Sequence, residues 1–282
     1  MNVHLILVPY DSGHRDLRMG RGPSRLYEAG ISSALEQTGA KVTVTTIDLP
    51  SDSFPAEVGA AFALNRLLAS TVAEAKAAGA LPIVLAGNCN TAIGTVTGLH
   101  ATNGRIPAVC WLDAHADFNT PETSSSGFLD GMAVAILTGR AWRAMTQTVE
   151  SFQPVPESRV VLVGTRDYDP IEEALLVSSP IRRVPVGELG VGFDEALDAI
   201  HAEAPTMYFH LDLDVVDISE GSANTFACAG GLSRTNVLDV FERATKKLEL
   251  GALAITAYDP TNGPDLHIEA LAFAVASAAV RK

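Results

Sequence analysis

A run of acidic residues follows a short apolar segment near the middle of the chain. Residues 111–131 read WLDAHADFNTPETSSSGFLDG, in which Asp113, His115 and Asp117 stand two positions apart. In an extended chain, side chains with that spacing point to the same side. Carboxylates crowded at the end of a buried strand repel one another and are costly to desolvate. A cation bound among them would remove that cost.

A second acidic pair repeats the spacing. Asp212 and Asp214 follow the apolar run MYFHL, which is typical of a buried strand. A divalent metal would convert the repulsion between four carboxylates into ligation. Mainly oxygen ligands with one imidazole suit manganese better than copper, and zinc stays open. Each motif alone is more typical of a turn or a solvated surface, but the two motifs at predicted strand ends favour a metal site.

Composition limits the classes of function. The 282 residues are 47% hydrophobic and 19% charged, which suits one large α/β domain or two smaller ones. A net charge of -13 disfavours binding to nucleic acid or to an anionic membrane. Three cysteines are too few, and odd in number, for a disulfide framework. No signal peptide or membrane span is evident, so we expect a cytoplasmic protein.

Short apolar segments rich in β-branched residues alternate with helical patterns. Most of these segments are apolar on both faces, as expected for strands covered by helices on either side. The alternation predicts a mostly parallel sheet between two helical layers. No linker or repeat divides the chain, so we expect a single domain over residues 1–282. The predicted strands are 3–10, 41–49, 81–87, 106–113, 159–165, 181–187, 206–214 and 252–259, and the clearest helical patterns are 22–39, 56–80, 233–251 and 266–282.

Two long irregular stretches, 115–130 and 217–233, each follow a predicted strand. Long loops in a compact domain are usually functional or disordered. Because both follow strands, both should lie at the carboxyl edge of the sheet, where open α/β folds place their sites.

The same motifs resemble the arginase/agmatinase (ureohydrolase) family over nearly the whole chain. The resemblance is carried by VPYDSGHRDLRMGRGPSRLYEAG, DAHADFNTPETSSSG, GTRDYDP, and HLDLDVVD followed by AGGLS. It implies a three-layer α/β/α fold around an eight-stranded parallel sheet. It also implies a homo-oligomer, a trimer or hexamer, and a binuclear manganese centre whose bridging hydroxide attacks the carbon of a guanidino or amidino small molecule.

The resemblance assigns metal ligands residue by residue. It implies that Asp113 and Asp212 bridge two Mn²⁺ ions. It further implies that His115 and Asp214 complete the shell of one ion and that Asp117 serves the other.

The resemblance also assigns the substrate side. It implies that Asn119 and Ser126 contact the amino-acid head of the substrate and that Asp169 faces its amino group. His210, which precedes the LDLD motif, is expected to pack or hydrogen-bond behind the metals.

Three positions depart from the family pattern. In LAGNCNTAIGT, Asn90 falls where the family has a metal-binding histidine, and its neutral amide is a weak ligand. Cys89 beside it offers a soft alternative, although a buried cysteine is more often structural. Asp130 replaces the catalytic histidine and could still move protons. Ala257 replaces a glutamate that grips guanidinium. Asp259 lies nearby and could compensate, but a residue two positions further along a strand is hard to equate with that glutamate.

Two hypotheses follow. The first is a manganese hydrolase that cleaves a C–N bond in a guanidino, N-hydroxyguanidino, amidino or formimino compound, with little activity on arginine. The second is a degenerate family member that binds a small molecule or a protein without hydrolysis. The joint presence of the five acidic and imidazole ligands with Asn119 and Ser126 favours the first.

Overall fold

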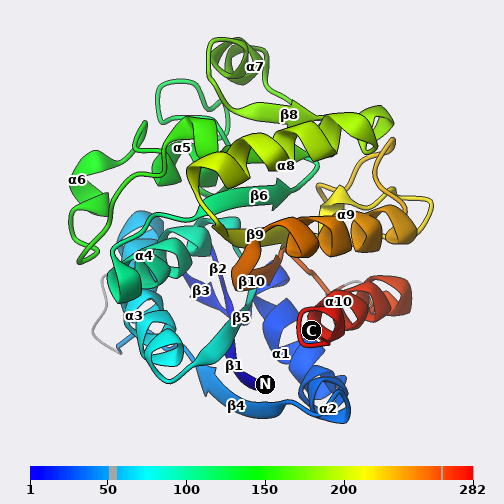
Figure 1. The fold of residues 1–282 in the computed structure, drawn as a ribbon. Helices are drawn as coiled ribbons and strands as arrows, with labels where there is room; N and C mark the ends of the chain where they lie inside the picture. The colour runs from blue at the N-terminus through cyan, green and yellow to red at the C-terminus, as the bar shows by residue number, and fades with distance from the viewer. Residues whose placement is uncertain (51–55, 262, 282) are drawn as a thin grey trace.

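The computed structural model describes residues 1–50, 56–261 and 263–281. In this part of the chain, eight parallel strands form one sheet in the order β4-β1-β5-β10-β9-β6-β7-β8 (Figure 1). The predicted sheet and all eight predicted strands are therefore confirmed. The strands are β1 (Asn2–Val8), β4 (Lys41–Thr46), β5 (Ala80–Ala86), β6 (Ala108–Leu112), β7 (Val160–Val163), β8 (Arg182–Val184), β9 (Thr206–Asp212) and β10 (Glu249–Thr256).

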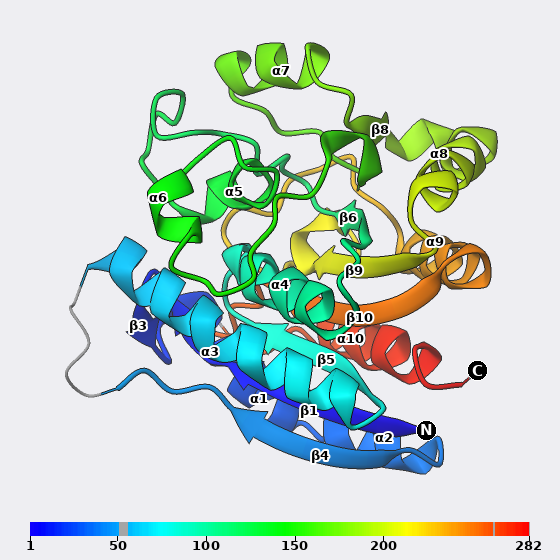
Figure 2. The same ribbon diagram turned by 60° about the vertical axis from the view of Figure 1, so that its left-hand side comes forward.

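Helices cover both faces of the sheet, which gives the predicted three-layer α/β/α architecture (Figure 2). Helices α1, α2, α8, α9 and α10 pack on one face, and α3, α4 and α5 pack on the other. A two-stranded antiparallel ribbon, β2 (Tyr10–Asp11) and β3 (His14–Arg15), follows β1. The helices are α1 (Gly22–Glu28), α2 (Ile31–Gln37), α3 (Glu57–Ala77), α4 (Ala92–Asn103), α5 (Ala133–Leu137), α6 (Arg143–Thr146), α7 (Pro170–Val177), α8 (Val191–Glu203), α9 (Arg234–Lys247) and α10 (Leu266–Ala278).

The alternation of side chains along each strand explains the two layers. In β1, Leu5 and Leu7 join the core beneath α1, α2 and α10, whereas Ile6 and Val8 join the core beneath α3 and α4. Because both faces of the strand are buried, the strand needs apolar residues at successive positions. The near-continuous apolar segments of the sequence therefore indicated a covered, parallel sheet.

The strand order brings distant segments together at the carboxyl edge. Strands β5, β10, β9 and β6 lie side by side at the centre of the sheet. The segments that follow them therefore meet, although they begin near residues 87, 257, 213 and 113. This is the edge at which the two irregular stretches were expected.

One helix prediction needs correction. The pattern over 22–39 predicts a single helix, but the structure has two, α1 and α2, separated at Gly30. Gly30 has a φ of 103°, a left-handed conformation that glycine adopts without steric cost. A Cβ on Gly22 would lie 2.3 Å from the carbonyl oxygen of Tyr258, so a glycine is needed there for α1 to approach the end of β10.

The other helical patterns are reproduced with shifted ends. Ser233, the first residue of the pattern, caps α9 through a reciprocal pair of hydrogen bonds with Asn236. The C-terminal pattern forms α10, and the last residue of that pattern lies outside the described residues. No helix of the described residues is long and apolar enough to cross a membrane.

Candidate metal centre

A cavity of about 230 Å³ lies at the carboxyl edge of β5, β6, β9 and β10. It contains every site residue predicted from the sequence except Asn90. Neither lysine nor arginine is among the described residues that line it. The lining residues are Met19, Cys89, Asp113, His115, Asp117, Asn119, Ser124, Ser126, Phe128, Asp130, Gly131, Asp167, Asp169, Glu172, Asp212, Asp214, Asn224, Phe226 and Ala257.

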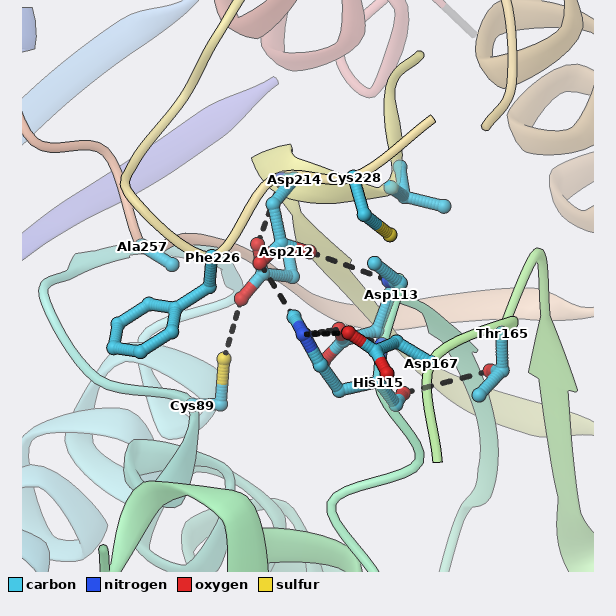
Figure 3. A network of polar contacts seen from close by, with 12 residues as sticks. Cys89, Asp113, His115, Thr165, Asp167, Asp212, Asp214, Phe226, Cys228 and Ala257 are labelled. Atoms are coloured by element: carbon cyan, nitrogen blue, oxygen red, sulfur yellow. Dashed lines mark hydrogen bonds and ion pairs between the residues drawn. The ribbon is translucent and has the colours of Figure 1, made fainter. Parts of the chain in front are cut away.

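One end of the acidic cluster is built around His115. Its Nδ1 lies 3.4 Å from Oδ1 of Asp113 and 3.4 Å from Oδ2 of Asp214 (Figure 3). Although burial opposes it, hydrogen bonding to Asp113 and Asp214 raises the pKa of His115. Burial also opposes the change at Asp214, but its hydrogen bond with His115 lowers the pKa of Asp214 to about 2. We call His115 and Asp214 the His115 side.

Backbone and indole groups fix the orientation of the carboxylates. Trp111 Nε1 donates to Oδ2 of Asp113 at 3.0 Å, and the His115 amide donates to Oδ1 of Asp113 at 2.7 Å. The Asp214 amide donates to Oδ1 of Asp212 at 2.8 Å, and the Ala114 amide donates to Oδ1 of Asp214 at 3.2 Å. Because these donors belong to β6 and to the residues directly after β6 and β9, the strand ends themselves aim the carboxylates into the cavity.

Asp117 enters the cavity by a different route from the one its spacing suggested. The chain is not extended there, because Asp117 has a φ of 51°, in the left-handed region that non-glycine residues seldom occupy. Its amide carbonyl accepts from Val134 at the start of α5, which holds the turn. Strained backbone of this kind is concentrated at functional sites.

The Asp117 carboxylate accepts no hydrogen bond from the described residues and is only 6% exposed. Burial, followed by repulsion from Asp113 and Asp130, raises its pKa well above the ordinary value. A buried carboxylate without a donor needs either a proton or a cation. This unpartnered group therefore fits a divalent metal, which would replace the missing donors.

The pKa values of Asp113 and Asp212 also fit a bound cation. Burial and the charge of Asp214 raise the pKa of Asp113 to about 6, and the same two causes raise the pKa of Asp212 well above its ordinary value. Asp113 lies within 4.8 Å of possible ligand atoms of His115 and Asp214 on one side, and of Cys89 and His210 on the other. Its position between the two groups suits a ligand shared by two ions.

Cys89, rather than Asn90, faces the acidic cluster. The Cys89 thiol donates to Oδ2 of Asp212 at 3.0 Å. The Asn90 amide group instead donates to Asp130 at 3.0 Å, and Asn90 does not line the cavity. Both residues lie in η2 (Cys89–Thr91), a single 3₁₀ turn after β5, where neighbouring side chains point in different directions. Cys89 therefore contacts the acidic cluster, whereas the Asn90 side chain is turned to Asp130.

Asp130 anchors the turn that carries Cys89. Its Oδ2 accepts from the backbone N–H of Cys89 and from the side chain of Asn88, both at 3.0 Å. Its Oδ1 accepts from the backbone N–H of Asn90 at 2.8 Å. Burial raises the pKa of Asp130 to about 7, although these hydrogen bonds act against the rise. Asp130 is thus a cavity-lining carboxyl that is also an acceptor for the neighbouring loop. We call Cys89, Asp117 and Asp130 the Cys89 side.

The residues expected to meet the head of the substrate lie along another wall. Asn119 donates to Asp169 at 3.0 Å and accepts from Thr123 at 2.9 Å. Ser126 accepts from the Phe128 amide at 3.1 Å and is exposed at the mouth of the cavity. Asn119 and Ser126 lie in the loop between β6 and α5, and Asp169 precedes α7 between β7 and β8, so two segments form this wall.

Ala257 lies in the cavity wall, whereas Asp259 does not. The carbonyl of Ala257 accepts from Asn224 at 2.9 Å. Asp259 lines a separate groove beside Asp265 and His267, so it does not replace the missing glutamate. Phe226 was not predicted as a site residue, yet its ring lies 5.7 Å from that of Phe128 and packs edge-on against His115. Its place in the loop after β9 was the only available signal.

His210 packs and hydrogen-bonds in the interior, as expected. Its Nδ1 lies 2.7 Å from the Tyr208 hydroxyl, its Nε2 lies 3.2 Å from Oγ1 of Thr256, and its ring stacks on Trp111 at 3.5 Å. Burial lowers the pKa of His210 to about 3, so this imidazole is neutral.

The fold and the cluster define a three-layer α/β/α protein with a metal-type site at the carboxyl edge of its parallel sheet. Residues 1–280 match the arginase family, and the chain belongs to that family. Arginase-1 from Rattus norvegicus is 31% identical over 93% of this chain and 85% of its own length. The family consists of hydrolases that act on C–N bonds other than peptide bonds, which confirms the predicted enzyme class.

Solved structures show the same fold. Arginase from Bacillus cereus superposes with a TM-score of 0.89 at 24% identity, over 100% of this chain and 99% of that chain. Formimidoylglutamase from Bacillus subtilis superposes with a TM-score of 0.78 at 17% identity, over 99% and 86% of the two chains.

Proposed function

We propose that this protein is a manganese-dependent hydrolase that cleaves a C–N bond in a guanidino, N-hydroxyguanidino, amidino or formimino small molecule. The observation that carries the proposal is that residues from two strand ends surround one cavity and point four carboxylates and an imidazole into it. These residues are Asp113, His115, Asp117, Asp212 and Asp214.

The donor set supports one or two divalent ions. Asp113 and Asp212 would be shared, with His115 and Asp214 on one side and Asp117 on the other. A divalent ion bound there would supply a Lewis acid and lower the pKa of a bound water to about 7. The protein itself contributes carboxylates whose orientation is fixed by backbone donors, which limits the reorganisation needed for binding.

The cavity chemistry supports a substrate with an amino group at one end. Asn119, Ser126 and Asp169 line one wall, and the carboxylates of Asp167 and Glu172 lie nearby. Without lysine or arginine among its described lining residues, the cavity favours cationic or neutral ligands over anions.

The absence of a carboxylate at Ala257 favours a substrate whose reacting group is less basic than guanidinium. A carboxylate at that wall could hold a guanidinium through two charge-assisted hydrogen bonds. Ala257 cannot do this, and Asp259 lies in another groove. An N-hydroxyguanidine or a formimino group needs less counter-charge, so we expect it to be hydrolysed better than arginine.

We propose Asp130 as the residue that transfers a proton to the leaving nitrogen. It lines the cavity and carries a protonatable oxygen, which is the requirement for general acid catalysis. Taking up a proton would weaken its hydrogen bonds to the turn at Cys89, so proton transfer and loop position are coupled at this residue.

The test is a substrate panel at fixed manganese. Release of urea or ammonia is measured from arginine, agmatine, N-hydroxyarginine and formiminoglutamate. We expect turnover of a weakly basic compound to exceed that of arginine. Arginine as the best substrate would contradict the argument from Ala257.

Binding without hydrolysis is the second candidate. It is favoured by the presence of Asp130 and Ala257, two of the three departures from the family pattern, in the lining of the same cavity. Protein that binds manganese but turns over none of the four compounds would support this candidate.

The net charge of -13 supports a cytoplasmic protein that binds neither nucleic acid nor membranes. We propose that residues 1–282 act as a single domain, and the family relationship supports a homo-oligomer, a trimer or hexamer.

A further inference from the structure

Cys89 differs from an ordinary core cysteine in its surroundings. Its thiol contacts Oδ2 of Asp212 at 3.0 Å and Oγ1 of Thr256 at 3.2 Å, and the residue lines the acidic cavity while being only 2% exposed. Asp113 also offers an oxygen within 4.8 Å of its sulfur. The sulfur therefore lies where the apolar core beneath α3 and α4 meets the carboxylates of the cavity, with oxygens of Asp212 and Asp113 on its polar side.

Cys110 provides an internal comparison. It lies in β6, is fully buried, and belongs to the apolar core beneath α8 and α9. No carboxylate contacts the Cys110 thiol among the described residues, whereas carboxylate oxygens of Asp212 and Asp113 lie near the Cys89 sulfur. A thiol that served only as a small apolar group would have the surroundings of Cys110.

The neighbouring imidazole cannot take the place of the sulfur. His210 lies close enough to Cys89 and Asp113 to be a ligand by distance. Both of its ring nitrogens, however, already have partners in Tyr208 and Thr256, and its ring is stacked on Trp111. The Thr256 hydroxyl joins His210 to Cys89 and holds the sulfur from behind, as outer groups hold metal ligands elsewhere.

We propose that Cys89 is a thiolate metal ligand, so that the cavity has two unlike metal positions. Asp113, His115, Asp212 and Asp214 form a position of oxygen and nitrogen ligands that suits manganese. Cys89, together with the shared carboxylates and Asp117, forms a position of sulfur and oxygen ligands that suits a softer ion such as zinc or cobalt. The inference rests on the proposed metal-dependent function and specifies its metal chemistry.

Binding at the second position displaces the thiol proton. The S–H bond breaks, a bond between sulfur and the metal forms, and the proton passes to solvent, with no change of oxidation state. One proton is therefore released from sulfur for each ion bound at this position.

The test is cobalt(II) titration of the full chain under reducing conditions, followed by absorption spectroscopy. Thiolate ligation produces a sulfur-to-cobalt charge-transfer band in the near ultraviolet. We expect the band in the wild type and in the matched variant Cys110→Ala. We expect Cys89→Ser to lack the band while it still binds cobalt at the His115 side, as measured by elemental analysis. Zinc affinity at the second position should fall at least ~10-fold in Cys89→Ser.

The wild-type spectrum needs no variant, so the test does not depend on Cys89→Ser folding. Bound cobalt without the band in the wild type would overturn the thiolate ligand and leave the proposed hydrolase intact. A band that persists in Cys89→Ser would overturn the assignment to Cys89. Absence of any bound cobalt or manganese would overturn the proposed function as well.

Discussion

The two sides of the cavity are built on equivalent strand ends but differ in how their charges are balanced. On the His115 side, an imidazole lies between two carboxylates and the pKa of Asp214 is lowered. On the Cys89 side, Asp117 has no donor, and burial raises the pKa values of Asp117 and Asp130. The comparison shows that one frame of strands can place two groups of different charge balance at one edge, and Asp113 and Asp212 would belong to both positions of the proposed metal centre.

The largest effect is expected from removing a shared carboxylate. Asp113→Asn should abolish metal binding on both sides, because it replaces a charged ligand that both positions use. Elemental analysis after dialysis against manganese measures the loss. Asp198→Asn, which removes a surface carboxylate paired with Lys247, is the control and should bind as the wild type does. Full metal content in Asp113→Asn would break the idea of a shared ligand.

The second effect tests Asp130. If it transfers a proton, Asp130→Asn should lower kcat by about 10²-fold or more, in the range of general acid catalysis. Because the pKa of Asp130 is about 7, the wild-type rate should fall as pH rises through neutrality and the acid loses its proton. The variant should lose this dependence. An unchanged pH profile with weaker metal binding would instead assign Asp130 only to holding the turn at Cys89.

The third prediction separates the two sides. Asp214→Asn should weaken manganese binding at the His115 side ~10–100-fold and leave the Cys89 side in place. Asp117→Asn should do the reverse. Calorimetric titration of both variants measures the two affinities. Equal losses at both positions in each variant would show that the cavity behaves as one indivisible site.

The smallest effect is expected at the wall of the cavity. Ala257→Glu adds a carboxylate that could accept from a guanidinium, and such charged hydrogen bonds contribute about 1.5–3 kcal/mol. The ratio of arginine to formiminoglutamate turnover should rise about tenfold. Ala257 already has a left-handed φ of 62°, so replacing it with glutamate adds little backbone strain. An unchanged ratio in Ala257→Glu would show that position 257 does not determine the choice of substrate.

The sequence predicted the elements and the site's location well because both depend on local pattern. Apolar segments identify strands buried on both faces, and loops that follow parallel strands must share an edge. Asp113 and Asp212 could be grouped for this reason before their distance was known.

Other features depend on backbone detail that residue types do not encode. The left-handed turn at Asp117 and the break at Gly30 are set by packing around them. Cys89 and Asn90 are neighbours in the single turn after β5, and the residue types do not show which of the two side chains lines the cavity. Spacing alone could not exclude Asp259, which faces another groove because the chain turns after Ala257.

The central claim is that the carboxylates after β6 and β9 form a metal centre. Crystals soaked in manganese, with data collected near the manganese absorption edge, test it most directly. We expect an anomalous difference peak bounded by Asp113, His115, Asp212 and Asp214, and a weaker manganese peak or none beside Cys89. The absence of any peak within the cavity at saturating manganese would show that these carboxylates do not form a metal centre.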